Sequence, residues 1–93
     1  MNEPQRSDYD QAARCLRRAT ELLQHETTGK IRVIREVLWL AIRRLSPDDL
    51  FSGDTAAEIT VLHDIADKVP VADARTEILK SVAVLRDGFQ PAP

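Results

Sequence analysis

Apolar side chains recur at alternating steps of three and four residues in four segments of the chain, and this spacing constrains the fold more than any other feature. Residues so spaced lie on one face of an α-helix, whereas a half-buried strand alternates apolar and polar residues. The sequence contains no such alternation, no hairpin dipeptide between β-branched runs and no internal repeat. The pattern therefore predicts an all-α protein.

Capping and helix-breaking residues indicate where the first two helices begin and end. Ser7 has the pattern of an N-cap, because a serine hydroxyl accepts from the exposed amides of the first turn and the aspartates after it favour the positive end of the helix dipole. We expect Thr27, Thr28 and Gly29 to end this helix, and a second helix to cover about residues 30–45. The short connection predicts an antiparallel hairpin.

The other half of the chain predicts a second hairpin. Pro47, after a serine cap, opens a short extra helical turn, since proline is tolerated where its missing amide donor would have no partner. A third helix begins at the cap Asp54 and stops before Pro70. The fourth covers about residues 72–87, and Gly88 is expected just past its C-terminal end.

Four helices with short connections predict a small up-down-up-down four-helix bundle, with the extra turn between helices 2 and 3. A chain of 93 residues holds one core, so we expect residues 1–93 to form a single helical domain with frayed tails at 1–6 and 90–93. The single cysteine cannot form an intramolecular disulfide, and no apolar stretch approaches the roughly 18 residues of a membrane span. We expect a cytoplasmic protein that does not contact a membrane.

The second predicted helix carries a wide apolar arc made of two neighbouring stripes. The first stripe is Ile31, Ile34, Leu38, Ala41 and Leu45, and the second is Val33, Val37 and Leu40. Such an arc predicts a central helix that touches two neighbours, or one neighbour and a partner subunit. Small domains bury a modest share of their surface and often complete their burial by association, so we favour a homodimer over a monomer.

Charge is distributed unevenly along the chain. Residues 1–45 hold nine basic and six acidic side chains and residues 46–93 hold four and nine, which gives net charges of +3 and −5 and the overall −2. In one interpretation the basic and acidic hairpins attract each other within the bundle. In the other, the arginine-rich face binds an acidic partner outside the chain.

Trp39 bears on that choice because it shares one side of its helix with several arginines. Our favoured interpretation is that the indole packs inside the fold with the arginine stems over it. The alternative is that Trp39 is exposed and anchors an interface, a role in which tryptophan and arginine are common. The candidate partner-binding residues are Trp39, Arg32, Arg35, Arg43, Arg14 and Arg18.

Nucleic-acid binding is the alternative function. The arginines of the first two helices, Arg17 among them, could contact phosphates as a stripe across the first hairpin. The negative net charge argues against it. In a helix-turn-helix reading, the fourth helix would have to recognise DNA, yet it carries Asp73, Glu77 and Asp87, which repel the phosphate backbone.

Catalytic and metal-binding patterns are weak. His25 and His63 each lie four residues from a carboxylate, which is the spacing of a surface helical pair rather than of a di-iron site. We expect His63 to be half-buried at the edge of its apolar stripe. Cys15 is expected to be a small boundary residue, with a thiol pKa lowered by neighbouring arginines as the alternative. No nucleophile elbow, phosphate-binding loop or zinc signature occurs, and we predict no enzyme activity, metal or cofactor.

Together these features predict a non-catalytic helical protein–protein interaction module that is regulatory or inhibitory and acts as a homodimer or adaptor. Its expected partner is a protein with an acidic face. The alternative is a nucleic-acid-associated regulator that binds through the basic first hairpin.

Overall fold

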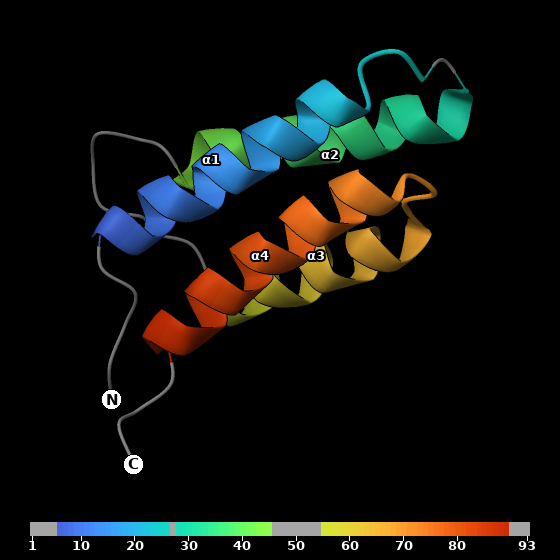
Figure 1. Cartoon of the computed structure of the whole chain (residues 1–93). Coiled ribbons are helices and arrows are strands. Elements are labelled where there is room, and N and C mark those ends of the chain that lie inside the picture. The colour runs from blue at the N-terminus through green and yellow to red at the C-terminus, as the bar shows by residue number, and fades with distance from the viewer. Residues whose placement is uncertain (1–5, 27, 46–54, 90–93) are drawn as a thin grey trace.

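The structure, a computed structural model, describes residues 6–26, 28–45 and 55–89, and within them it contains four helices and no strand (Figure 1). The helices are α1 (Arg6–Leu22), α2 (Gly29–Leu45), α3 (Thr55–Lys68) and α4 (Ala72–Phe89). The predicted all-α class is therefore confirmed for the described part. The extra turn predicted at Pro47 and the cap predicted at Asp54 lie outside the described residues.

The first helix begins and ends earlier than predicted. It starts at Arg6, so Arg6 belongs to the helix rather than to a frayed tail, and Ser7 lies in the first turn and is not the cap. It ends at Leu22 because the amide of Leu23 donates to two carbonyl oxygens, of Ala19 at 3.2 Å and of Thr20 at 3.1 Å. This bifurcated arrangement tightens the chain into a turn before the predicted break at Thr27.

The other described helix ends follow local chemistry. The hydroxyl of Thr28 accepts a hydrogen bond from the amide of Ile31 at 3.4 Å and so caps α2, which begins at Gly29. The third helix stops at Lys68, two residues before Pro70, as predicted. Helix α4 continues through Gly88, which we expected beyond its end. A glycine that ends a helix usually adopts a positive φ, and no described glycine does so.

The predicted apolar stripes form the core. In α1 and just after it, Ala12, Leu16, Ala19 and Leu23 recur at steps of four and three and are fully buried, and Tyr9 packs against the core at its edge. All five residues of the first stripe of α2 are buried as well. At one end of the bundle the hydroxyl groups of Tyr9 and Thr55 lie 3.0 Å apart and join α1 to α3. The helical periodicity therefore identified most of the core correctly.

The helices do not share their contacts equally. Helices α1 and α4 make the most extensive contact, α1 also packs on α2 and α4 on α3, whereas α2 and α3 barely touch (Figure 1). Helix α2 does touch two neighbours, as one of the two alternatives predicted, but the central pair of the bundle is α1 and α4. None of the described helices is long and apolar enough to cross a membrane.

Candidate functional site

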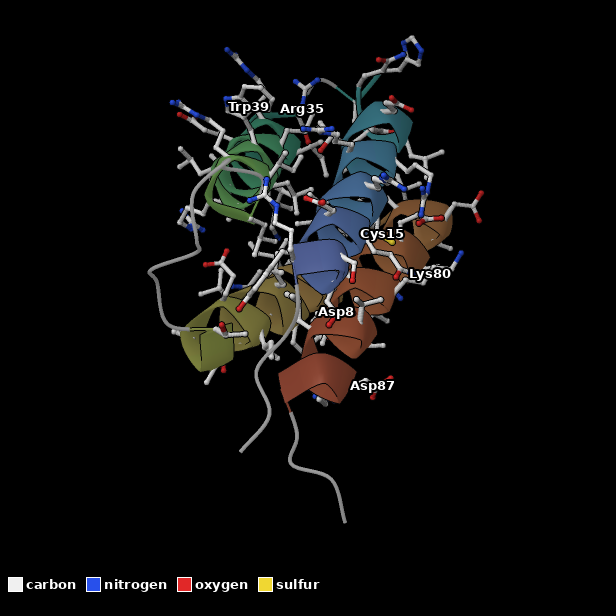
Figure 2. All side chains as sticks on the ribbon, turned by 90° about the vertical axis from the view of Figure 1, so that its left-hand side faces the viewer. Asp8, Cys15, Arg35, Trp39, Lys80 and Asp87 are labelled. Carbon is white, nitrogen blue, oxygen red and sulfur yellow. The ribbon has the colours of Figure 1, made fainter. Side chains whose placement is uncertain are left out.

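Trp39 lies on the outer side of α2, where its side chain is 54% exposed. Arg32, Arg35 and Arg43 share this side of the helix, because they lie seven, four and four residues from Trp39. Figure 2 shows Trp39 and Arg35 next to each other at the edge of α2, away from α3 and α4. The favoured prediction that the indole packs inside the fold is wrong, because more than half of Trp39 is exposed to solvent.

A groove between α1 and α2 runs beside the indole. It has a volume of about 270 Å³ and is lined by Trp39, Arg35 and Ile42 of α2 and by Arg17, Thr20, Glu21 and Gln24 from α1 and the turn after it. Nη1 of Arg35 donates to the backbone oxygen of Gln24 at 3.2 Å. This bond satisfies a carbonyl group near the end of α1 and holds the Arg35 guanidinium beside the groove.

The arginines that line this groove or lie on the outer side of α2 have no internal counter-charge in the described part of the chain. Within the described residues Arg17, Arg32, Arg35 and Arg43 form no ion pair. Exposed guanidinium groups with no internal counter-charge attract carboxylates or phosphates from outside the chain. We call Arg17, Arg32, Arg35, Trp39 and Arg43 the arginine–indole surface.

The two candidate arginines of α1 lie elsewhere. Nε of Arg18 is 3.1 Å from Oε2 of Glu77 on α4, and its Nη2 donates to Sγ of Cys15 at 3.2 Å. Arg14 lines a separate hollow with Ser7, Asp10, Gln11 and Arg18. The structure therefore brings together the α2 members of the predicted set and separates Arg14 and Arg18 from them.

Arg17, rather than Arg14 or Arg18, is the α1 residue that reaches the groove. A signal for this was present in the sequence. Arg17, Thr20 and Gln24 follow the steps of a helix face next to the buried Leu16 stripe, which is the face that an adjacent α2 would meet.

Internal charge pairing occurs as the first interpretation of the uneven charge predicted. Arg44 of α2 binds Glu58 of α3 through two bonds, Nη2 to Oε1 at 2.7 Å and Nε to Oε2 at 3.1 Å. The hydrogen bonds to Glu58 raise the pKa of Arg44 above its ordinary value. This pair and Arg18–Glu77 each join a basic residue of the first half to an acidic residue of the second.

The remaining candidates are two histidines and the cysteine. His25 and His63 are both exposed, so the prediction of a half-buried His63 is wrong. The described part of the chain contains no group of three or more histidine, cysteine or acidic side chains placed to hold a metal ion. Cys15 is buried, and this burial raises the pKa of its thiol despite the nearby guanidinium of Arg18. The alternative of a lowered thiol pKa is therefore wrong.

Comparison of the chain with known protein families, with curated proteins and with solved structures gives no match. The chemistry of the arginine–indole surface must therefore be argued from its residues. A half-exposed indole beside a groove offers a flat apolar contact, and the guanidinium groups around it bind carboxylates in a directional way. This combination suits an apolar side chain flanked by acidic residues.

Proposed function

We propose that the protein is a non-catalytic helical interaction module, regulatory or inhibitory, that binds an acidic protein partner through the arginine–indole surface and acts as a homodimer or adaptor. One observation carries the proposal: Trp39 is 54% exposed on a helix face whose arginines form no ion pair among the described residues. Exposed tryptophan among arginines is the composition of interface hot spots. We place the protein in the cytoplasm because its only cysteine is unpaired.

The proposal takes the fold as an up-down-up-down bundle. Two ion pairs support this order of helices. Arg18 near the end of α1 meets Glu77 near the start of α4, and Arg44 at the end of α2 meets Glu58 near the start of α3. Each pair is what antiparallel neighbours would form.

A protein partner is favoured over a nucleic acid by the mixture of groups at the site. Glu21 lines the groove itself, and Glu36 lies on the outer side of α2, so a continuous phosphate backbone would meet carboxylates as well as guanidinium groups. A folded acidic surface can place its apolar side chains on the indole and its carboxylates on the arginines.

Trp39 is the only tryptophan of the chain, so its fluorescence reports on this surface directly. The probe is an amphipathic helical peptide rich in glutamate and leucine, and the comparison peptide carries lysine in place of glutamate. We expect the acidic peptide alone to shift the Trp39 emission. Trp39→Ala should weaken binding by about 2 kcal/mol, or roughly 30-fold. The anisotropy of a labelled acidic peptide measures this change.

Arg43→Glu and Arg86→Glu form a matched pair of variants, because both arginines lie in the last turn of a helix. The same charge is changed in the same position of the helix dipole. Arg43→Glu should weaken binding of the acidic peptide and Arg86→Glu should leave it unchanged. Equal loss in both, or binding of random duplex DNA with a steep salt dependence in place of the peptide, would contradict the proposal.

A further inference from the structure

Two apolar stripes face each other across the boundary between α2 and α3. Residues 33, 37, 40 and 44 of α2 and residues 58, 61, 65 and 68 of α3 follow helical steps of three and four. Arg44 belongs to the first stripe and Glu58 to the second, and their ion pair places the end of the first stripe against the start of the second. We call the apolar members, Val33, Val37, Leu40, Val61 and Ile65, the α2–α3 seam.

The seam is not closed within one chain. Val33 is 61% exposed, Leu40 44% and Val61 42%, while Val37 and Ile65 are half-buried. Helices α2 and α3 contact each other only slightly. Three of the six large apolar side chains that are exposed in the described structure therefore lie at this boundary. Adjacent exposed apolar side chains of this kind mark interaction surfaces rather than the ordinary scatter of a soluble protein.

The charges that border the seam are balanced. Arg44 is paired with Glu58, and Nζ of Lys68 lies 2.9 Å from Oδ2 of Asp64. On the other flank of α2, the four arginines of the arginine–indole surface outnumber the carboxylates of Glu21 and Glu36 beside them, so that surface keeps a net positive charge.

This difference identifies the occupant of the seam. A twofold dimer places each surface against the same surface of its partner, so a patch with a strong charge of one sign repels itself. The arginine–indole surface is excluded as a dimer contact on that ground, whereas the apolar, charge-balanced seam is complementary to its own copy. We infer that a second copy of this chain docks on the α2–α3 seam. The inference rests on the homodimer part of the proposed function.

Sedimentation velocity of the wild-type chain from about 1 µM to about 500 µM tests the inference, because dimerisation follows mass action. We expect a reversible monomer–dimer equilibrium in that range. Leu40→Glu with Val61→Glu places carboxylates on both sides of the seam and should weaken the dimer by about 100-fold or more. Both positions are largely exposed in one chain, so the helical circular dichroism of the double variant should stay unchanged.

Leu22→Glu with Leu79→Glu is the matched control, since these leucines are exposed to a similar degree on α1 and α4, at 43% and 38%. The control should dimerise like the wild type. Should the seam double variant fail to fold, Val33→Glu alone, at the most exposed seam position, replaces it. A wild-type chain that stays monomeric throughout, or a folded seam variant that dimerises normally, overturns the inference.

Peptide binding separates this inference from the proposed function. The seam variant should remain able to bind the acidic peptide, and Arg43→Glu should dimerise normally while binding that peptide poorly. A dimer that Arg43→Glu dissolves and the seam variant does not would overturn the inference. If the wild type does not bind the acidic peptide but forms a dimer that depends on the seam, only the acidic-partner proposal is contradicted.

Discussion

The contact between α1 and α4 and the boundary between α2 and α3 are built from different side chains. Helices α1 and α4, which make the most extensive contact, both carry small buried residues: Ala12, Cys15 and Ala19 on α1, and Ala74 and Ser81 on α4. Small side chains let two helix axes approach closely. At the α2–α3 boundary the side chains are valine, leucine and isoleucine, with the long Arg44–Glu58 pair at one end. The first contact is closed and the second is open.

This difference suggests a division of labour within a very small domain. The closed α1–α4 pair supplies a core that holds the other two helices in place. Helix α2 is then covered by α1 on only part of its circumference, which leaves the arginine–indole surface on one flank and the α2–α3 seam on the other. Both surfaces proposed for binding therefore exist because α2 is only partly covered by its neighbours.

Enlarging a side chain should distinguish the closed contact from the open one most strongly. Ala19→Leu adds methyl groups at a fully buried position of α1 and should destabilise the fold by about 3 kcal/mol. Val33→Leu at the open seam should change the free energy of unfolding by less than about 0.5 kcal/mol. Urea unfolding of dilute protein measures both. Similar losses in the two variants would mean that the two boundaries are equally closed.

Thiol reactivity should show nearly as large a contrast. Cys15 is 3% exposed and its thiol pKa is raised by burial, so the reactive thiolate is both scarce and covered. Its reaction with a disulfide reagent should be about 100-fold slower in the folded than in the unfolded chain. A Cys15→Ala chain that carries Val33→Cys should react at nearly the unfolded rate in dilute solution. Rapid labelling of Cys15 in the folded wild type would contradict a closed α1–α4 contact.

The smallest expected effect concerns acid. Although burial alone would raise it, the pKa of Glu77 is lowered by hydrogen bonds from Arg18 and Lys80. A carboxyl group with a lowered folded pKa stabilises the fold above its ordinary value of 4.5, and this contribution is lost as pH falls from there through the folded value. Arg18 is half exposed, so solvent screening keeps this contribution small.

Glu77→Gln should therefore be less stable than the wild type at neutral pH, and the difference should shrink as the solution is acidified from about pH 5 to about pH 3. Glu26→Gln is the control, because Glu26 is exposed and forms no ion pair within the described residues. It removes a carboxylate without touching the Arg18–Glu77 pair and so gives the baseline for the Glu77→Gln measurement. A Glu77→Gln difference that is constant down to low pH would show that the α1–α4 contact gains nothing from this charge.

The sequence predicted the helices and their buried stripes well, and the site only in part. Ile34, Leu38 and Ala41 are buried where the three-and-four spacing placed them. The grouping of Trp39 with Arg32, Arg35 and Arg43 also followed from one helix and is present in the structure. The sequence grouped Arg14 and Arg18 with this surface, but they lie elsewhere. Their position relative to α2 depends on how α1 is rotated against its two neighbours.

By itself, then, the sequence determined which residues share a face of each helix, because that relation depends only on the local geometry of 3.6 residues per turn. It also determined the uneven charge and the single indole. Only the tertiary structure decided which faces are covered. Trp39 is exposed, the α2–α3 seam is open and Arg18 pairs with Glu77 because of how closely the helices approach one another. That distance is set by side chains far apart in the sequence.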